Sequence, residues 1–399
     1  MTSPPILIAG AGIGGLTAAL ALLRRGHDVR VFEQAGQLGE VGAGLQLSPN
    51  ATRALHLVGL SEALAGIAAE PSGKEIRLWS TGQTWKLFDT GSESVAEYGS
   101  PYYMVYRPDL HRILVDAVRA LSPEAIRLDS KCERFEQDGA AGTVRVQLAD
   151  GSMHEGRALI GADGVHSAVR RQLFGDGAAS YSGCMAWRGV IPVEKLPAHL
   201  VRPVGTNWVG PGRHVIHYPL RGGKLMNFVG IVETQRWMAE SWTQRGTHEE
   251  CHADFEGWHD DVHSLIAHID VPYRWALMAR PPLPHWTQGR VALLGDACHP
   301  TLPFLAQGAV MAIEDGFVLG RALAEVEGVP QALQRYEAAR IGRTSEIVRK
   351  STENGRRFHN PALANAEGAA AYVDREWSRE RIAERYEWLF RYRVDEVDL

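Results

Sequence analysis

The residues best suited to chemistry begin with a glycine pattern near the N-terminus. Gly10, Gly12 and Gly15 form G-x-G-x-x-G directly after an apolar run at Ile6–Ala9, and the next apolar run ends in Glu33. Such glycines let the backbone approach a pyrophosphate, while the start of the following helix presents free N–H groups. Because strand, helix and acid are all present, the pattern predicts a dinucleotide site rather than a merely structural turn. Glu33 can accept hydrogen bonds from both ribose hydroxyls and would repel a 2′-phosphate, which favours FAD or NAD over NADP at this site.

Two later segments also end an apolar run in an acid. Asp163 follows "ALIGA" and precedes Gly164, and Asp296 follows "RVALLG". A loop stiffened by Pro303 and a helix beginning near Gly308 come next. Ligands of open α/β sheets bind outside the carboxyl ends of parallel strands, so we expect the three motifs to meet at one sheet edge. The alternative for Asp296 is that it only caps the following turn.

A third feature is an H-x-x-x-Y spacing in the alternating segment "RHVIHYPL". Side chains of a strand alternate, so His214 and Tyr218 share one face and His217 points to the other. The first two side chains can flank one small aromatic ring; the alternative is a polar sheet face without a ligand. Gln307, just before Gly308, either points into the same pocket or satisfies backbone groups of its loop.

Composition narrows the class of protein. The chain has 399 residues, a net charge of −5 and 45% hydrophobic residues, which is typical of a globular protein and argues against nucleic acid as a partner. It has no apolar run long enough for a membrane helix, and a predicted strand begins too early for a secretory signal. Four cysteines without C-x-x-C spacing predict free thiols in the cytoplasm. Cys298 and His299 are adjacent, and on an extended chain they would face opposite ways, so we expect no metal site.

With the three motifs in this order and spacing, the chain resembles the flavin-dependent aromatic hydroxylases with a single FAD-binding domain, the para-hydroxybenzoate hydroxylase class. It is most similar to the branch that contains salicylate hydroxylase, 3-hydroxybenzoate 6-hydroxylase and 6-hydroxynicotinate 3-monooxygenase, over nearly its whole length. No second complete glycine fingerprint is present. This agrees with a family in which NAD(P)H binds transiently, and it argues against reductases and Baeyer–Villiger enzymes with two dinucleotide domains. Pro303 and Phe304 depart from two members of the branch, so the exact ring substrate stays open.

The resemblance and the residue patterns together predict an α/β fold. Between about residues 181 and 280 apolar and polar residues alternate, which is typical of an antiparallel sheet with one buried face. We expect a Rossmann-like FAD-binding domain, an inserted and mostly antiparallel β-sheet substrate domain, and a C-terminal helical segment. The expected boundaries are 1–72, 105–180 and 281–345 for the first, 73–104 and 181–280 for the second, and 346–399 for the third. Trp377, Trp388, Leu389 and Phe390 either form a subunit contact, as in a homodimer, or pack onto their own chain.

The resemblance also implies roles for individual residues. It assigns Gly10, Gly12 and Gly15 to the FAD pyrophosphate, Glu33 to the adenosine ribose, Arg107 to the ribityl or phosphate region, Asp163 to FAD and NAD(P)H use, Asp296 to the ribityl chain, and Pro303 and Gly308 to the isoalloxazine. A helix start beside the ring would stabilise negative charge on reduced flavin. His214 and Tyr218 match a pair that lines the substrate pocket in this branch, with His214 favoured as general base by its intrinsic pKa.

The implied function is a monooxygenase that uses FAD and NADH or NADPH. Dioxygen would add to flavin C4a to give a hydroperoxide, which a phenolate-type ring of a hydroxybenzoate or hydroxynicotinate would attack. Two alternatives remain open from the sequence. One is a flavin oxidoreductase that acts on a small aromatic or heterocyclic substrate without hydroxylating it, and the other is a non-catalytic FAD- or NAD-binding regulator.

Overall fold

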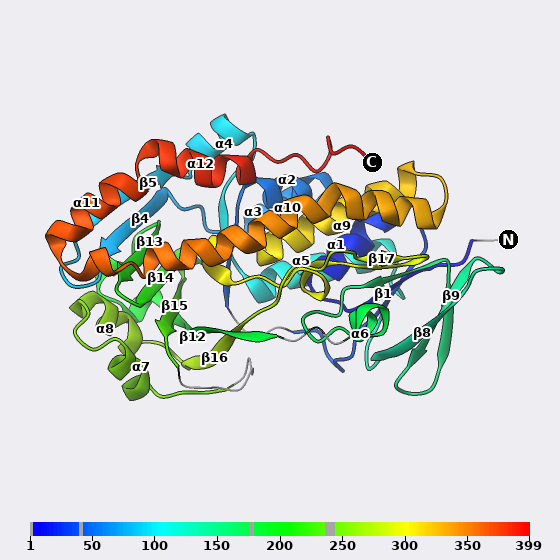
Figure 1. Cartoon of the computed structure of the whole chain (residues 1–399), viewed down its shortest axis with the longest axis horizontal. Coiled ribbons are helices and arrows are strands. Elements are labelled where there is room, and N and C mark those ends of the chain that lie inside the picture. Colours follow the sequence, from blue (N-terminus) through cyan, green and yellow to red (C-terminus); the bar gives the residue numbers. More distant parts are fainter. Residues whose placement is uncertain (1–2, 40–42, 176, 178, 236–243) are drawn as a thin grey trace.

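The structure, a computed structural model, describes residues 3–39, 43–175, 177, 179–235 and 244–399. The expected ranges 1–72, 105–180 and 181–280 therefore each contain a few positions outside the described residues. Two large sheets lie at opposite ends of the elongated molecule, and one long helix, α10 (Val329–Phe358), runs alongside both (Figure 1).

A six-stranded sheet forms one end of the molecule. Its order is β17-β18-β11-β1-β2-β7, and all neighbours are parallel except β17 and β18. The strands are β1 (Ile6–Ala9), β2 (Val29–Phe32), β7 (Ile126–Arg127), β11 (Ala158–Gly161), β17 (Thr287–Gln288) and β18 (Val291–Leu293). β1 and β11 are wholly buried, as parallel strands covered on both faces must be.

Helices cover this sheet. The helices of this part are α1 (Ile13–Leu23), α2 (Pro49–Leu57), α3 (Ser61–Ile67), α5 (Arg107–Leu121), α6 (Ala168–Phe174) and α9 (Gly308–Glu325). α9 packs closely on α1, since a Cβ built at Gly316 would lie 2.7 Å from the Ala18 backbone nitrogen. This close packing brings the N-terminal ends of two helices to the same region of the sheet edge.

A seven-stranded sheet forms the other end. Its order is β16-β12-β15-β14-β13-β4-β5, and only the β13–β4 pair is parallel. The strands are β4 (Gly73–Leu78), β5 (Thr84–Asp89), β12 (Ser180–Pro192), β13 (Val204–Gly210), β14 (Arg213–Leu220), β15 (Leu225–Glu233) and β16 (Tyr273–Ala279). α7 (His248–Asp254) and α8 (Asp260–Ala267) pack on one face of it (Figure 1). The predicted α/β fold, with a mostly antiparallel second sheet, is confirmed.

Two smaller sheets were not anticipated. β8 (Cys132–Asp138), β9 (Thr143–Leu148) and β10 (Met153–Gly156) form an antiparallel sheet beside the parallel one. β3 (Gly44–Leu47) pairs with β6 (Tyr103–Tyr106), and α4 (Ser92–Tyr98) precedes β6. Gly44, Leu45 and Gln46 of β3 contribute to one wall of the site described below.

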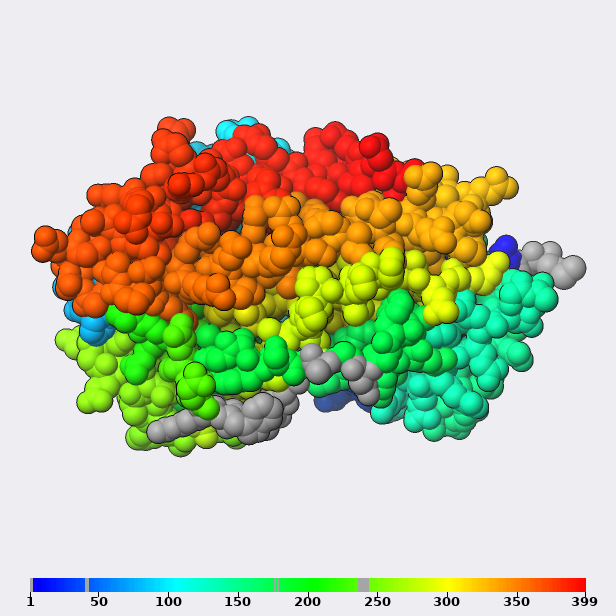
Figure 2. Space-filling view, in the orientation of Figure 1, coloured from blue at the N-terminus to red at the C-terminus, as the bar shows by residue number. Residues whose placement is uncertain are grey.

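The C-terminal helices pack on their own chain. They are α10 (Val329–Phe358), α11 (Ala366–Glu376) and α12 (Arg379–Phe390), and Figure 2 shows them in orange and red over one side of the molecule. Trp377, Leu389 and Phe390 are buried among residues of this chain, which settles the earlier alternative for them in favour of intramolecular packing. α10 runs unbroken through the boundary expected between residues 345 and 346. Within the described residues, no helix combines the length and apolarity needed to cross a membrane.

Candidate active site between the two sheets

The carboxyl ends of three parallel strands open on one cavity of about 340 Å³. Gly12 after β1, Gly164 after β11 and Asp296 after β18 all line it. The opposite wall belongs to the seven-stranded sheet and includes His214 and Tyr218. The volume lies in the range of small-molecule sites, roughly 300–1,000 Å³. The three motifs therefore meet at one sheet edge, as the strand order requires.

The three N-terminal glycines have different structural tasks. A Cβ at Gly10, where φ is +102°, would lie 2.4 Å from the Ala162 carbonyl oxygen, and one at Gly15 would lie 2.1 Å from the Gly10 oxygen. These two glycines permit the close packing of strand and helix. A Cβ at Gly12 would meet nothing within 4 Å, and this residue faces the cavity as the N-cap of α1 without a side-chain cap. Gly12 thus leaves room for a ligand beside a helix N-terminus.

The acids of the first two motifs hold backbone in place. Glu33 accepts hydrogen bonds from the Ala11 and Ala35 N–H groups, at 2.8 and 2.9 Å. Asp163 accepts one from Ala168 N–H at 2.8 Å and another from the Ser167 hydroxyl, so its carboxylate caps the start of α6. The neighbouring Gly164 faces the cavity, and the expected part of Asp163 in FAD and NAD(P)H use stays a prediction.

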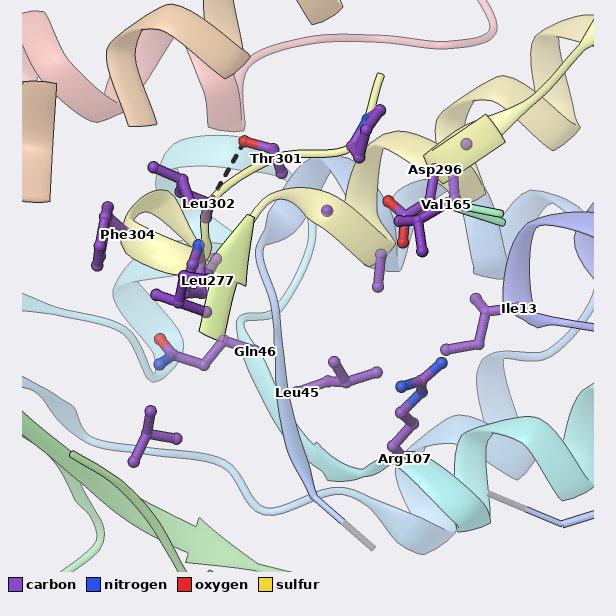
Figure 3. A pocket seen from close by; sticks show the side chains of 18 of the residues that line it. Ile13, Leu45, Gln46, Arg107, Val165, Leu277, Asp296, Thr301, Leu302 and Phe304 are labelled. Carbon is purple, nitrogen blue, oxygen red and sulfur yellow. Dashed lines mark hydrogen bonds between the residues drawn. The ribbon is translucent and has the colours of Figure 1, made fainter. Parts of the chain in front are cut away.

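Arg107 and Asp296 lie in the part of the cavity beside α1. In Figure 3, this part of the cavity is surrounded by Arg107 at the start of α5, Ile13 at the start of α1, and Asp296. The opposite part of the cavity is lined by Leu277, Leu302 and Phe304. The Asp296 side chain is exposed to the cavity yet surrounded by protein. This desolvation raises the pKa of its carboxyl, while His299 and Arg107 act in the opposite direction.

The loop after β18 carries the cavity to the start of α9. Pro303 begins the short turn Pro303–Leu305, and Pro303, Ala306 and Gly308 line the cavity. Helix α9 begins at Gly308, and no side chain caps its first turn. α10 fixes the loop from behind, since Ser351 Oγ donates to Leu302 O at 2.6 Å and Asn354 Nδ2 to Phe304 O at 2.7 Å.

Gln307 does not line the cavity. Its amide nitrogen donates to Ser48 Oγ at 3.1 Å, and its amide oxygen accepts from Asn50 Nδ2 at 3.2 Å. The side chain is 2% exposed. The structure thus favours the alternative of a loop amide, and substrate contact by Gln307 stays a prediction.

Buried charged side chains stabilise the loop that follows β18. Asp315 pairs with His299 Nε2 at 2.6 Å and with Arg340 Nε at 2.8 Å, and it accepts the Gly295 N–H. Burial opposes ionisation of Asp315, but His299 and Arg340 lower the pKa of its carboxyl.

The premise of an extended chain at Cys298 was wrong. A 3₁₀ turn at Gly295–Ala297 precedes it, and the candidate ligand atoms of Cys298, His299 and Asp315 lie within 4.8 Å of one another. With Arg340 already paired to Asp315, the group is a hydrogen-bonded support for the loop. All four cysteines are free thiols, as predicted.

The wall formed by the seven-stranded sheet presents alternate side chains. His214, Ile216 and Tyr218 of β14 line the cavity, while His217 is buried on the other side, as the alternation predicts. Arg188 of β12 also lines it. Arg188 of β12 pairs in register with Val229 of β15, and Val229 pairs with Ile216 of β14. The three side chains therefore lie next to one another on the same face of the sheet. Burial raises the pKa of Tyr218 despite Arg188 and a hydrogen bond with Gln46, so the phenol stays protonated.

His214 is 1% exposed and lies among aromatic rings. Its Nδ1 lies 2.6 Å from Nε2 of His359, and Nδ1 of His359 lies 2.7 Å from Glu233 Oε1. Burial and the neighbouring His359 hold the pKa of His214 well below its usual range, so the imidazole is neutral near pH 7. Sequence reasoning missed Arg188, His359 and Glu233. No local pattern marks them, since His359 is 145 residues from His214 along the chain.

Fold and cavity together define a dinucleotide-binding α/β protein whose second sheet forms the opposite wall of the cavity. The chain matches the family described as "FAD binding domain" over residues 4–351, and it belongs to this family. It is 39% identical to 3-hydroxybenzoate 6-hydroxylase of Polaromonas naphthalenivorans, over 98% of this chain and 96% of that protein. It is 40% identical to the 3-amino-4-hydroxybenzoate 2-monooxygenase PtnB3 of Streptomyces platensis, over 90% and 89%.

A solved structure agrees with these relatives. Klebsiella pneumoniae HpxO, complexed with FAD and uric acid, superposes with a TM-score of 0.84 at 28% identity, over 98% of this chain and 96% of that one. The resemblance inferred from the three motifs is therefore confirmed.

Proposed function

We propose that this FAD-dependent aromatic-ring monooxygenase hydroxylates a phenolic aromatic acid of the hydroxybenzoate or hydroxynicotinate type, with NADH or NADPH as electron donor. One observation carries the proposal. A single cavity is lined at one end by the glycine motif and two helix starts, and at the other by a buried histidine, a tyrosine and an arginine.

The residues at the first end fit FAD. Gly12 leaves open space at the start of α1, and Arg107 supplies a cation in the same part of the cavity. Uncapped N–H groups at the starts of α1 and α9 suit a pyrophosphate and the electron-rich edge of a flavin ring. FAD, when bound, supplies the electron transfer and the oxygen chemistry.

The other end binds and activates the ring. Arg188 offers a guanidinium to the substrate carboxylate, and the protonated hydroxyl of Tyr218 donates a hydrogen bond to a substrate oxygen. Neutral His214 accepts the phenolic proton at Nε2, because Nδ1 is already bonded to His359. Loss of this proton makes the ring electron-rich, which hydroxylation requires. Leu277 and Phe304 keep water from the ring.

The first test is a substrate screen with the FAD-loaded protein. We expect 3-hydroxybenzoate, 3-amino-4-hydroxybenzoate or 6-hydroxynicotinate to accelerate NADH or NADPH oxidation. With oxygen-18 gas, mass spectrometry should find a single labelled atom in the ring product. Accelerated oxidation with no label in the ring would instead identify the non-hydroxylating oxidoreductase.

A matched pair of variants tests the general base. His214→Asn should reduce hydroxylation at least tenfold, the usual size of a lost acid–base group being about 10²–10⁴, while flavin reduction by NAD(P)H stays close to wild type. His217→Asn removes a buried histidine from the opposite face of the same strand and should retain hydroxylation. Equal turnover in the two variants would remove His214 from the reaction.

A further inference from the structure

A row of three polar side chains leads away from His214 to the surface. The row consists of His214, His359 at the end of α10, and Glu233 at the end of β15. The side chain of His359 is 3% exposed and that of Glu233 is 55% exposed. The row therefore begins at the wall of the proposed substrate cavity and ends at solvent.

The two ends open on different spaces. His214 lines the cavity described above, whereas His359 and Glu233 line a second cavity of about 400 Å³ on the other side of Leu302 and Phe304. Phe304 and Phe358 pack against His214, with ring centroids 5.6 and 5.1 Å away. The aromatic rings separate the two cavities here, and the hydrogen-bonded row connects them.

The backbone keeps the members of the row in register. Gly212, in the turn between β13 and β14, donates its N–H to His359 O at 3.2 Å and accepts from Glu233 N–H at 2.9 Å. A Cβ at Gly355 of α10 would lie 2.6 Å from the Phe304 ring, so Phe304 is held tightly against the helix. The row is thus a fixed feature of the fold.

The chemistry of Glu233 determines where the protons lie. The hydrogen bond from His359 lowers the pKa of Glu233, so its carboxylate is ionised and can only accept. Nδ1 of His359 must then carry a proton. With one proton on each ring, Nε2 of His359 accepts, and Nδ1 of His214 donates to it. Nε2 of His214 then carries no proton, and its lone pair can accept one from a molecule in the cavity.

Resting on the proposed function, we infer that Glu233 and His359 hold His214 in the tautomer that accepts the phenolic proton, and conduct that proton to the second cavity. The phenolic proton moves to His214 Nε2, and the Nδ1 proton of His214 passes to His359 Nε2. The Nδ1 proton of His359 passes to Glu233 and from there to water. Each group gains one proton and loses one, and the reverse sequence returns a proton to the product and restores both rings. His359 and Glu233 are positioning and relay residues and do not touch substrate.

The tautomers can be observed without any substrate. In FAD-loaded protein labelled with nitrogen-15 histidine, we expect both His214 and His359 to be neutral with the proton on Nδ1, assigned by comparison with His214→Asn and His359→Phe. Glu233→Leu should mix the tautomers, whereas Glu233→Gln, whose amide oxygen still accepts from His359, should retain them. A wild-type His214 protonated at Nε2 would overturn the inference.

Proton movement is the second readout. When 3-hydroxybenzoate, 3-amino-4-hydroxybenzoate or 6-hydroxynicotinate is mixed with the FAD-loaded protein in weak buffer, an indicator dye reports proton release. Glu233→Gln and His359→Phe should slow this release at least tenfold, with flavin reduction by NAD(P)H unchanged. Glu353→Gln removes another exposed carboxylate, one that belongs to α10 and pairs with Arg357, and serves as the control. Release as fast in Glu233→Gln as in this control would contradict the relay.

The two readouts separate failure of the inference from failure of the proposed function. Absence of any flavin spectral change with all three aromatic acids would count against the substrate assignment and, with it, against proton release as described. The nitrogen-15 spectra would still decide whether Glu233 sets the tautomer of His214.

Discussion

The two ends of the cavity are built from different materials. The end beside α1 consists mainly of backbone: open glycines at positions 12 and 164 and the uncapped starts of α1 and α9. The end beside the seven-stranded sheet consists of side chains: Arg188 of β12 and His214 and Tyr218 of β14 are its polar groups, and His359 and Glu233 lie behind His214. The first end suits a constant ligand such as a dinucleotide, while the second can change with single substitutions.

This difference explains how relatives can share one cofactor site and differ in ring substrate. Backbone N–H groups do not depend on residue type, provided that glycine stands where a Cβ would collide. A pocket made of side chains depends on each residue that contributes to it. We therefore expect substitutions at the first end to affect fold and flavin, and those at the second to affect the ring.

The largest effect should come from Gly10→Ala. The residue has φ +102° and its Cβ would meet the Ala162 carbonyl at 2.4 Å. Backbone strain and overpacking each cost about 1–3 kcal/mol, so the free energy of unfolding should fall by roughly 2–6 kcal/mol. Urea denaturation of the flavin-free protein measures it.

Gly12→Ala is the matched control for this prediction. Its Cβ would enter open space, so the flavin-free protein should unfold like wild type, while FAD affinity should fall at least tenfold, or by about 1.4 kcal/mol. If both variants lost the same stability without flavin, the proposed division of labour between Gly10 and Gly12 would be wrong.

At the second end, Arg188→Met should weaken recognition of the substrate carboxylate. A hydrogen bond to a charged group contributes about 1.5–3 kcal/mol, so kcat/KM for an aromatic acid should fall roughly 10- to 100-fold. Arg188→Lys should restore part of it. The same comparison with the uncharged hydroxybenzamide should show little change, and an equal loss for acid and amide would rule out a carboxylate contact.

The backbone-built end could be predicted from the sequence because its determinants are contiguous. The glycine pattern, each acid at a strand end and each helix start can be recognised from a short stretch of sequence. The alternation of β14 also correctly separated His214 from His217. These inferences need only strand and helix periodicity.

The sequence was less informative where a side chain chooses between nearby partners or meets a distant one. Asp163 caps α6 and Gln307 bonds Ser48 and Asn50, although either residue type suits a ligand equally well. His359 reaches His214 from the end of α10, and Glu233 reaches His359 from the end of β15. A distance of 126 or 145 residues along the chain leaves no local pattern to detect.

The pH dependence of stability should arise largely at the second sheet. His214 and His217 are both buried there, and burial lowers the pKa of His217 from 6.5 to about 4. Between these values the unfolded chain binds more protons than the folded one, so stability rises with pH and falls as pH drops below about 6.5. From pH 7 to pH 5, His217 alone should cost about 2 kcal/mol. His217→Asn should flatten this dependence in urea titrations, and an unchanged pH slope would show that His217 titrates normally.

The smallest effect tests the junction of the two ends, at Ala306. This residue lines the cavity with φ +55°, a left-handed conformation that costs a non-glycine residue about 1–2 kcal/mol. Ala306→Gly removes the strain but adds unfolded-state freedom worth about 0.5–1 kcal/mol, so the net gain in unfolding free energy should stay below about 1 kcal/mol. Ala306→Val should instead destabilise the flavin-free protein, because a β-branched residue fits this conformation worst. Equal stabilities for glycine, alanine and valine at this position would mean that the loop relaxes freely and that α10 does not hold it, despite the bonds from Ser351 and Asn354.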